Sequence, residues 1–373
     1  MDRQEGGFID FFSSIPDHRI NRRKLHPVNE ILLLTFCGVL AGCDGWDDLE
    51  FFGKTKLDSL RKYLAFENGV PSDDTLRRFF RVLDPAVFEA CFMKWVRSFQ
   101  LDLEGKIVAI DGKTSRRSFD GANKALHMVS AFVSEVGIIL GQLKTAEKSN
   151  EITAIPELLD LLDLAGATVT IDAMGCQTKI VEKIAEKEAN YLIGLKGNQG
   201  TLNDDVRMFF EKKPVGTIFE TAIEYDKGHG RLEARRCTIT EDIQWLRNNH
   251  PQWKKLTSII EIESQREIKG VISIEKRYYI SSLPAKTEKI LNAVRQHWGV
   301  ENQLHWVLDV CFNDDQSRIR KGNAPSNMAI IKKTALNVLR IVKPTRPRVS
   351  IKKMRKLAGW DENFMSELLC AKF

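Results

Sequence analysis

The stretch KIVAIDGK, residues 106–113, decides the fold class of this 373-residue chain. It is a short apolar run rich in Ile and Val, which is typical of a buried strand, and it ends on Asp111 followed by a glycine. Two more extended segments follow at residues 125–133 (ALHMVSAFV) and 137–145 (GIILGQLKT). The turn signal at 134–137 predicts that these two segments pair as a hairpin.

Beyond residue 150, helical and extended patterns alternate. Helices are predicted at 151–164, 177–188 and 202–211, and strands at 167–173 (ATVTIDA) and 190–196 (NYLIGLK). The order β-β-β-α-β-α-β-α places antiparallel strands before parallel βα units. It therefore predicts an α/β fold with a mixed sheet flanked by helices.

The regions on either side of this α/β core have a different character. Helical spacing and capping residues predict helices throughout residues 1–100, as an N-terminal helical domain. Four β-like segments predict a β-rich insertion at about 214–285, and helices return at 288–308 and 326–342. The expected organisation is thus a helical domain at 1–100, an α/β domain with the insertion at 101–343, and a basic C-terminal tail at 344–373.

Composition excludes several classes of protein. With 43% hydrophobic and 28% charged residues, the chain is neither collagenous, coiled-coil nor disordered. Its longest apolar run, residues 31–41, is too short to span a bilayer, and acidic residues interrupt the N-terminus, unlike a signal peptide. The seven cysteines are scattered without a CxxC, which favours reduced thiols. We therefore expect a cytoplasmic protein without membrane association.

Charge is concentrated near the C-terminus. The chain carries a net +6, yet residues 316–360 contain thirteen Lys or Arg and no Asp or Glu, so the remainder sums to −7. A strongly basic segment on an acidic body suggests a polyanionic partner, usually nucleic acid. The alternative is that the acidic body neutralises the segment internally.

Three carboxylates are candidates for a catalytic site. Asp111 and Asp172 each end a strand, where open sheets build their sites, although a strand-end Asp can simply cap a helix or form a turn. Glu301 is on a predicted helix with His297 and His305 on the same stripe, and the absence of HExxH there argues against a zinc protease. Burying this Glu unpaired would be costly, so a shared divalent cation is expected to compensate it. Oxygen ligands suit Mg²⁺ or Mn²⁺, and two such ions can catalyse phosphoryl displacement.

Basic and amide side chains that could contact DNA phosphates follow the predicted strands and the Glu301 helix, although each could instead be an ordinary surface residue. Trp298 could stack on a displaced base, or belong to the core. The candidate DNA contacts are Lys113, Arg116, Arg117, Lys196, Asn198, Gln199, His229, Arg231, Arg235, His297, Trp298, Arg318, Arg320 and Lys321.

Several long motifs resemble the H-repeat-associated insertion-sequence transposases, which are bacterial DDE transposases with an RNase H-like core. The matching segments cover nearly the whole chain. They are IPDHR, GWDDLEFFG, AIDGK, KSNEITAIPELLDLLDL with TIDAMGCQ, YLIGLKGNQG, KGHGRLEAR, RYYIS and HWGVENQLHWVLDV. Val294, His297 and Leu308 occupy the positions where broader relatives with an insertion have Tyr, Arg and Lys, so the signature linked with hairpin formation is missing.

The resemblance implies that Asp111, Asp172 and Glu301 are the metal-binding catalytic triad. It implies a DNA transposase that uses Mg²⁺ or Mn²⁺, with two ions expected, to hydrolyse phosphodiesters at element ends and transfer the freed strand to target DNA. Double-stranded DNA, both terminal repeats and target, is then the partner, and a homodimer is expected in the active complex. Two alternatives remain: a metal-dependent nuclease without strand transfer, and an inactive remnant that only binds DNA.

Overall fold

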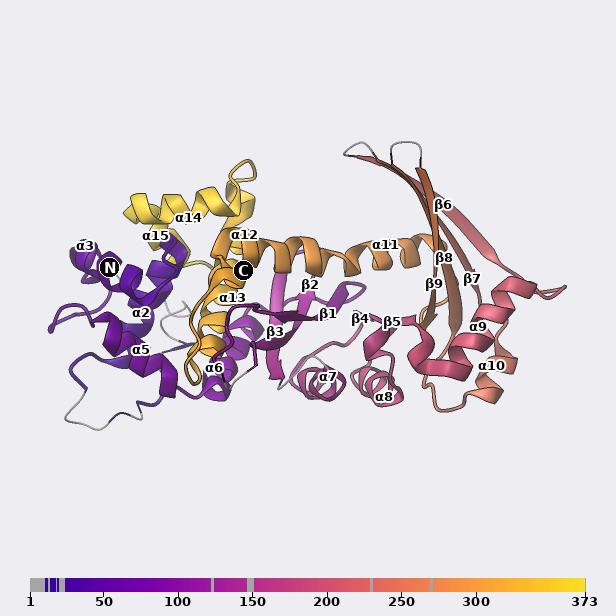
Figure 1. Ribbon diagram of the computed structural model, residues 1–373, viewed down its shortest axis with the longest axis horizontal. Coiled ribbons are helices and arrows are strands. Elements are labelled where there is room, and N and C mark those ends of the chain that lie inside the picture. Colours follow the sequence, from indigo (N-terminus) through magenta and orange to yellow (C-terminus); the bar gives the residue numbers. More distant parts are fainter. Residues whose placement is uncertain are drawn as a thin grey trace.

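The computed structural model describes residues 11–372, apart from 13, 18, 20–23, 122–123, 146–150, 229–230 and 269–270. A mixed sheet that contains β1 (Ile107–Thr114) runs through its centre (Figure 1). Within the described residues this sheet has nine strands, in the order β3-β2-β1-β4-β5-β9-β8-β7-β6. The other strands are β2 (His127–Val133), β3 (Ile138–Thr145), β4 (Thr168–Ile171), β5 (Asn190–Leu195), β6 (Glu220–Gly228), β7 (Arg231–Thr240), β8 (Ser258–Ile268) and β9 (Val271–Ser281).

The direction of the strands changes at β1. This strand pairs antiparallel with β2 and parallel with β4, and β4 pairs parallel with β5. β2 and β3 form the predicted hairpin. Helices α7 (Glu151–Asp160) and α8 (Thr178–Glu186) lie on one side of the sheet and α11 (Thr287–His297) on the other (Figure 1). The predicted fold class, an α/β fold with a mixed sheet flanked by helices, is confirmed.

Burial along β1 explains why its sequence changes character at its middle. Residues 107–110 are buried, and partial exposure begins at Asp111. The first half is covered on both faces, so it is apolar throughout. The second half extends beyond β4, whose last paired residue is Ile171 opposite Ile110. The first polar residue of the strand therefore stands where its parallel neighbour ends.

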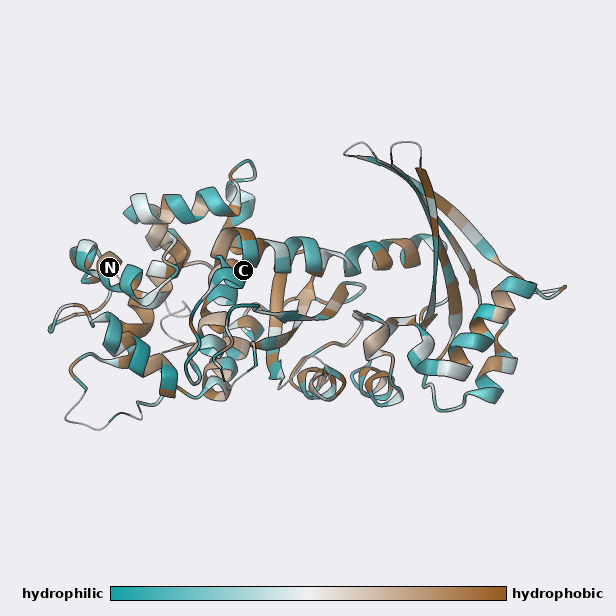
Figure 2. Ribbon diagram, in the orientation of Figure 1, coloured by the Kyte–Doolittle hydropathy of each residue, from teal (hydrophilic) through white to brown (hydrophobic). Residues whose placement is uncertain are grey.

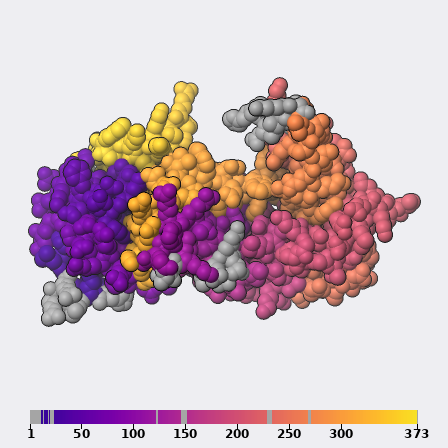
Figure 3. Space-filling view, viewed as in Figure 1, coloured from indigo at the N-terminus to yellow at the C-terminus, as the bar shows by residue number. Residues whose placement is uncertain are grey.

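The predicted β-rich insertion is confirmed, and it continues the central sheet. β9 returns antiparallel to β5, with Leu192 opposite Ser281, and β8, β7 and β6 follow as a meander. A second apolar cluster joins Ile290 and Val294 of α11 to Cys237 and Ile260 of the meander. The short helix α10 (Gln244–Asn249) and α9 (Gly200–Lys212) complete this end of the molecule, which lies opposite the N-terminal helices (Figure 3).

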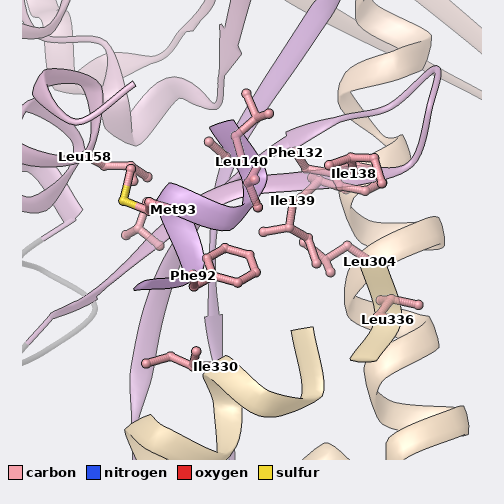
Figure 4. Close-up of a cluster of buried hydrophobic side chains, with 14 of the residues drawn as sticks. Phe92, Met93, Phe132, Ile138, Ile139, Leu140, Leu158, Leu304, Ile330 and Leu336 are labelled. Atoms are coloured by element: carbon pink, nitrogen blue, oxygen red, sulfur yellow. The ribbon is translucent and has the colours of Figure 1, made fainter. Parts of the chain in front are cut away.

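The N-terminal region is helical, as predicted, and it packs against the sheet through a long buried helix, α13 (Ala324–Val342). Figure 4 shows part of this core, in which Phe92 of α6 (Pro85–Arg97), Ile138 of β3 and Leu336 of α13 belong to one buried apolar cluster. Among the described residues no single helix is long and apolar enough to cross a membrane; α2 and α3 reach that character only together, across a 97° bend. The N-terminal helices are α2 (Val28–Ala41), α3 (Trp46–Thr55), α4 (Leu57–Leu60), α5 (Asp73–Val82) and α6 (Pro85–Arg97).

The C-terminal segment, expected as a basic tail, contains two helices, α14 (Ile351–Trp360) and α15 (Glu362–Leu369). Figure 2 shows α14 as largely hydrophilic on its visible side. Its inner side is anchored by the buried Arg355, which donates to the carbonyl oxygens of Val39 and Cys311. Arg346 forms an ion pair with Glu367 at 2.6 Å. Two of the basic residues in this segment therefore stabilise the fold.

Candidate active site

Asp111 and Asp172 are neighbours across two parallel strands. Because Ile110 is in register with Ile171, the next residue of each chain segment is an aspartate at the same edge of the sheet. Asp172 also caps the short helix η3 (Ala173–Gly175), and its Oδ1 accepts from the backbone N–H groups of Met174 and Gly175 at 3.0 and 3.4 Å. Capping and ligand binding are therefore compatible here, since both capping bonds use the same oxygen.

Gly112, directly after the first aspartate, is constrained by what lies against it. A Cβ there would be 2.2 Å from Oε1 of Glu151 and 2.6 Å from Nε2 of His127. These two side chains are buried and pair at 2.6 Å. Only glycine leaves room for this pair beside β1, which accounts for the Asp-Gly sequence.

Glu301 lies in a π-helix. The single helix predicted from residue 288 to about 308 is instead three pieces: α11, the π-helix η5 (Val300–His305) and α12 (Trp306–Phe312). π-helical turns are rare and often occur at functional sites. Leu304 anchors this turn in the core near Leu336 of α13 (Figure 4), so Glu301 and His305 flank a fixed apolar contact.

The π-helix brings two side chains to the first aspartate. His305 Nδ1 lies 3.3 Å from Glu301 Oε2 and 3.6 Å from Asp111 Oδ2. One donor atom from each of these three residues lies within 4.8 Å of the other two. His305 is 5% exposed, whereas the Glu301 side chain is 52% exposed and faces solvent in part. The spacing from Glu301 predicts the stripe on which His305 lies, but it does not mark His305 as a site residue.

The electrostatics of this cluster favour a bound cation. Burial raises the pKa of Asp111 to about 6; His305 opposes that shift, whereas the carboxylates of Glu301 and Asp172 add to it. The contact with His305 lowers the pKa of Glu301. Asp111, Asp172 and Glu301 thus influence one another's charge, and the imidazoles of His305 and His297 lie close enough to act on them. Such a donor set fits a hard divalent cation.

Lys113, the nearest predicted phosphate contact, is occupied within the protein. Its side chain is 10% exposed, and Nζ lies 2.7 Å from Asp309 and 3.5 Å from Asp315. Sequence reasoning did not identify these partners because they lie about 200 residues further along the chain. The lysine therefore links β1 to α12 and the loop that follows it.

Two basic loops lie side by side next to this ion pair. Arg320 Nε donates to the carbonyl of Arg117 at 2.9 Å, and Lys321 pairs with Asp120 at 2.8 Å. Arg116 has an 82% exposed side chain and a longer contact, 3.4 Å, with Asp315. Arg117 and Arg318 are exposed. The structure therefore gathers the predicted contacts of 116–117 and 318–321 on one surface.

Asn198 and Gln199 hold the segment that follows the second aspartate. Asn198 Nδ2 donates to the carbonyl of Ala173 at 2.7 Å, and Gln199 Nε2 donates to that of Cys176 at 2.6 Å. Lys196, which precedes them after β5, is exposed. The two amides are thus placed to position Asp172, a role that the sequence did not indicate.

The remaining predicted contacts are scattered over the insertion and α11. His229 lies outside the described residues, as does the side chain of Arg231. Arg235 pairs with Glu233 at 2.9 Å on β7. His297 Nδ1 is 3.1 Å from the Thr170 hydroxyl, and the indole of Trp298, 44% exposed, lies under the guanidinium of Arg277 at 5.2 Å.

Comparison with known families assigns the chain. Residues 102–338 match the family described as the transposase DDE domain, and residues 9–96 match the DDE_Tnp_1-associated family. This chain belongs to the DDE transposase family. The family assignment agrees with a mixed sheet in which two neighbouring parallel strands are each followed by an aspartate.

Individual relatives of this DDE transposase family member span almost its whole length. "Putative transposase YncI" of Escherichia coli O157:H7 is 43% identical over 375 residues, covering 97% of this chain and 94% of its own. "H repeat-associated putative transposase YhhI" of E. coli K12 is 41% identical and covers 97% of both chains. A piggyBac transposase synaptic complex with hairpin DNA aligns at a TM-score of 0.44 and 13% identity, over 97% of this chain and 78% of that one. That score is too low to bear on the fold or the function.

Proposed function

We propose that this chain is a DNA transposase whose catalytic triad is Asp111, Asp172 and Glu301. The observation that supports the proposal is that Asp111 lies beside Glu301 of the π-helix, while Asp172 follows the end of β4, the parallel neighbour of β1. Family membership supports a transposase role, and the triad specifies the chemistry. The reaction would cleave one phosphodiester at each element end and join the freed 3′-hydroxyl to target DNA.

The three carboxylates would hold Mg²⁺ or Mn²⁺, and the proposal includes two ions. Bound as a pair, such ions activate an attacking oxygen and stabilise the leaving oxygen of an in-line displacement. Asp111 is fixed by its strand, Asp172 by its capping bonds and Glu301 by the Leu304 anchor. The chain's contribution is thus to hold oxygen donors in place before DNA arrives, which is where most of this kind of catalysis originates.

In the first step, a water oxygen would bond to phosphorus while the P–O3′ bond breaks, leaving a 5′-phosphate and a 3′-hydroxyl. In the second step, that 3′-hydroxyl would attack a phosphodiester of target DNA and release another 3′-hydroxyl. Neither step needs a covalent protein–DNA intermediate. Because two element ends must be joined, the active complex is proposed to be a homodimer on double-stranded DNA.

The basic loops at 116–117 and 318–321 are proposed to hold the DNA backbone beside the triad. They continue directly from β1 and from the loop after α12, and they present exposed cations on one surface. Such contacts supply affinity that does not depend on sequence. Trp298, beside Glu301 in the chain and partly exposed, is available for stacking on a base.

The decisive experiment incubates the protein with Mg²⁺ and a duplex that ends in the repeats flanking its gene. Nicks at the repeat ends together with joined products support the transposase. Nicks without joining indicate a nuclease, and binding without nicks indicates a remnant. Excess chelator should abolish both products, and Ca²⁺ should permit binding with poor chemistry because its coordination is looser.

The triad is tested by Asp111→Asn, Asp172→Asn and Glu301→Gln. Each should abolish cleavage while DNA binding, which rests on cationic contacts, stays close to wild type. Asp163→Asn is the matched control, since that carboxylate is 86% exposed after α7. A triad variant that still cleaves near the wild-type rate would remove its residue from the site.

A further inference from the structure

His305 lies against two of the three residues of the proposed triad. Its Nδ1 faces both Glu301, at 3.3 Å, and Asp111, at 3.6 Å. The side chain is buried, and it projects from the π-helix on the same side as Glu301. Both neighbours are carboxylates that belong to the proposed triad.

The 3.3 Å contact with Glu301 is a long hydrogen bond, and the 3.6 Å contact with Asp111 lies beyond hydrogen-bond distance. Charge-assisted N–H···O bonds fall at about 2.7–2.9 Å, and a contact of 3.6 Å does not qualify as a hydrogen bond. Donor atoms that surround one ion behave differently, because ligands at about 2.1 Å from an octahedral ion lie about 3 Å from each other. Spacings of 3.3 and 3.6 Å between Nδ1 and the carboxylates are closer to the second pattern.

Burying His305 also costs folding free energy. Its Nε2 has no hydrogen-bond partner among the described residues. An unsatisfied buried polar atom costs about 1–3 kcal/mol, and such atoms in folded proteins call for an explanation in function. An apolar side chain could be buried at this position without leaving a polar atom unpaired. The imidazole is therefore expected to have a function at its other nitrogen, Nδ1.

We propose that His305 Nδ1 is a direct ligand, so that Asp111, Glu301 and His305 form a mixed oxygen–nitrogen metal site that prefers Mn²⁺ to Mg²⁺. The inference rests on the proposed function, because it assigns a fourth donor to the same site. Mg²⁺ is bound through oxygen, whereas imidazole suits first-row transition ions. Asp172 is not a member of this donor group.

A second imidazole, that of His297, lies near the same carboxylates and has to be considered as an alternative metal ligand. His297 lies one turn before Glu301 and is influenced by the charges of Asp172 and Glu301. Its Nδ1, however, is 3.1 Å from the Thr170 hydroxyl. It does not belong to the group of donors within 4.8 Å. His305 is therefore the nitrogen ligand that the geometry selects.

The test measures Mn²⁺ bound to the full-length protein, with the metal alone as the probe. Electron spin-echo modulation reports whether a nitrogen is bonded directly to Mn²⁺, and competition with Mg²⁺ gives the preference between the ions. His305→Asn places an amide oxygen near the position of Nδ1. It should abolish the nitrogen signal and weaken Mn²⁺ binding by about 10–100-fold, while Mg²⁺ binding is largely kept.

His250→Asn is the matched control. His250 is another buried histidine paired with a carboxylate, Asp205 at 2.8 Å, but it lies beside α9 and α10. Its replacement should leave the nitrogen signal intact. His305→Asp is a second variant with an all-oxygen donor set; it should bind Mg²⁺ without a nitrogen signal, and circular dichroism verifies that each variant is folded.

Each outcome has a defined meaning. Wild-type protein that binds Mn²⁺ without a nitrogen signal, or His305→Asn that retains the signal, overturns the inference and leaves the proposed triad standing. If Asp111→Asn binds Mn²⁺ as tightly as wild type, the metal site itself is wrong and the proposed function falls with it. Loss of the signal in His305→Asn alone supports the inference.

Discussion

Arg340 of α13 donates a hydrogen bond to the backbone carbonyl of Gln303, inside the π-helix that carries Glu301. The same guanidinium donates to the carbonyl of Gly137 in the β2–β3 turn and lies over the ring of Phe132 at 5.0 Å. Burial lowers its pKa to about 10, so it stays charged at neutral pH. One half-buried cation thus links the glutamate-bearing turn to the central hairpin.

Replacing Arg340 with Met should therefore disturb the site as well as the fold. Two carbonyls would be left without a charged donor, and we expect the free energy of unfolding in urea to fall by about 2–4 kcal/mol. Mn²⁺ affinity should fall too, because Glu301 would no longer be supported, and Arg340→Lys should recover part of both. Unchanged Mn²⁺ affinity in a destabilised Arg340→Met protein would mean that the arginine has a structural role alone.

Neutralising Asp111 should stabilise the metal-free protein. Burial raises the pKa of this carboxyl to about 6, above its unfolded value near 4, with Glu301 and Asp172 adding to the shift. The folded state therefore binds the proton more tightly between about pH 4 and 6, so wild-type stability falls as pH rises through that window and stays lower above it.

Asp111→Asn lacks this titration and should exceed wild type by about 3 kcal/mol at pH 8, with the difference shrinking towards pH 4. Urea unfolding in chelator measures it. Added Mn²⁺ should stabilise wild type more than the variant, because the ion binds the folded carboxylates. A variant less stable than wild type at pH 8 would show that the charge of Asp111 is compensated within the protein.

The sequence predicted most of the elements because their signals are local. Extended runs, helical spacing and turn residues located β1 to β5 and the hairpin turn at 134–137. The π-helix was missed, since six residues are too few to separate its period from that of an α-helix. What holds it is tertiary: a Cβ on Gly299 would meet Ser134 Oγ at 2.9 Å, and Arg340 reaches Gln303 from another helix.

The site was predictable to the extent that it follows from topology. Two aspartates at strand ends suffice to propose Asp111 and Asp172, because parallel strands end together. The surroundings depend on contacts that no local pattern encodes, such as Lys113 with Asp309 or Asn198 with the carbonyl of Ala173. The polar residues predicted to contact DNA phosphates thus form two groups: some face solvent, and others make contacts that stabilise the fold.

That division is testable with Lys113 and the basic loops. Lys113→Met leaves Asp309 and Asp315 without their partner and should cost about 2–4 kcal/mol in urea unfolding, with no change in the salt dependence of DNA binding. Arg117→Gln with Arg318→Gln should instead leave stability unchanged and flatten the log–log salt slope by about 1.8, or 0.9 for each phosphate contact. Fluorescence anisotropy at several NaCl concentrations distinguishes the two variants. A flatter salt slope for Lys113→Met would mean that Lys113 does contact DNA.

The basic C-terminal segment can be divided in the same way. Arg346 and Arg355 have partners in Glu367 and the Val39 carbonyl, so replacing either should lower stability. On and just before α14, four further cations are exposed and form no ion pair with described residues: Arg348, Lys352, Lys353 and Lys356.

We expect glutamine at these four positions together to weaken DNA binding for every sequence tested and to flatten the salt slope by about 0.9 for each DNA phosphate that these cations neutralise. Turnover at saturating DNA should change little, because α14 packs on α2 and contributes no carboxylate to the triad. Circular dichroism and urea unfolding should match wild type, since all four side chains face solvent. A four-fold variant with an unchanged slope would mean that the acidic body of the protein, and not DNA, balances this charge.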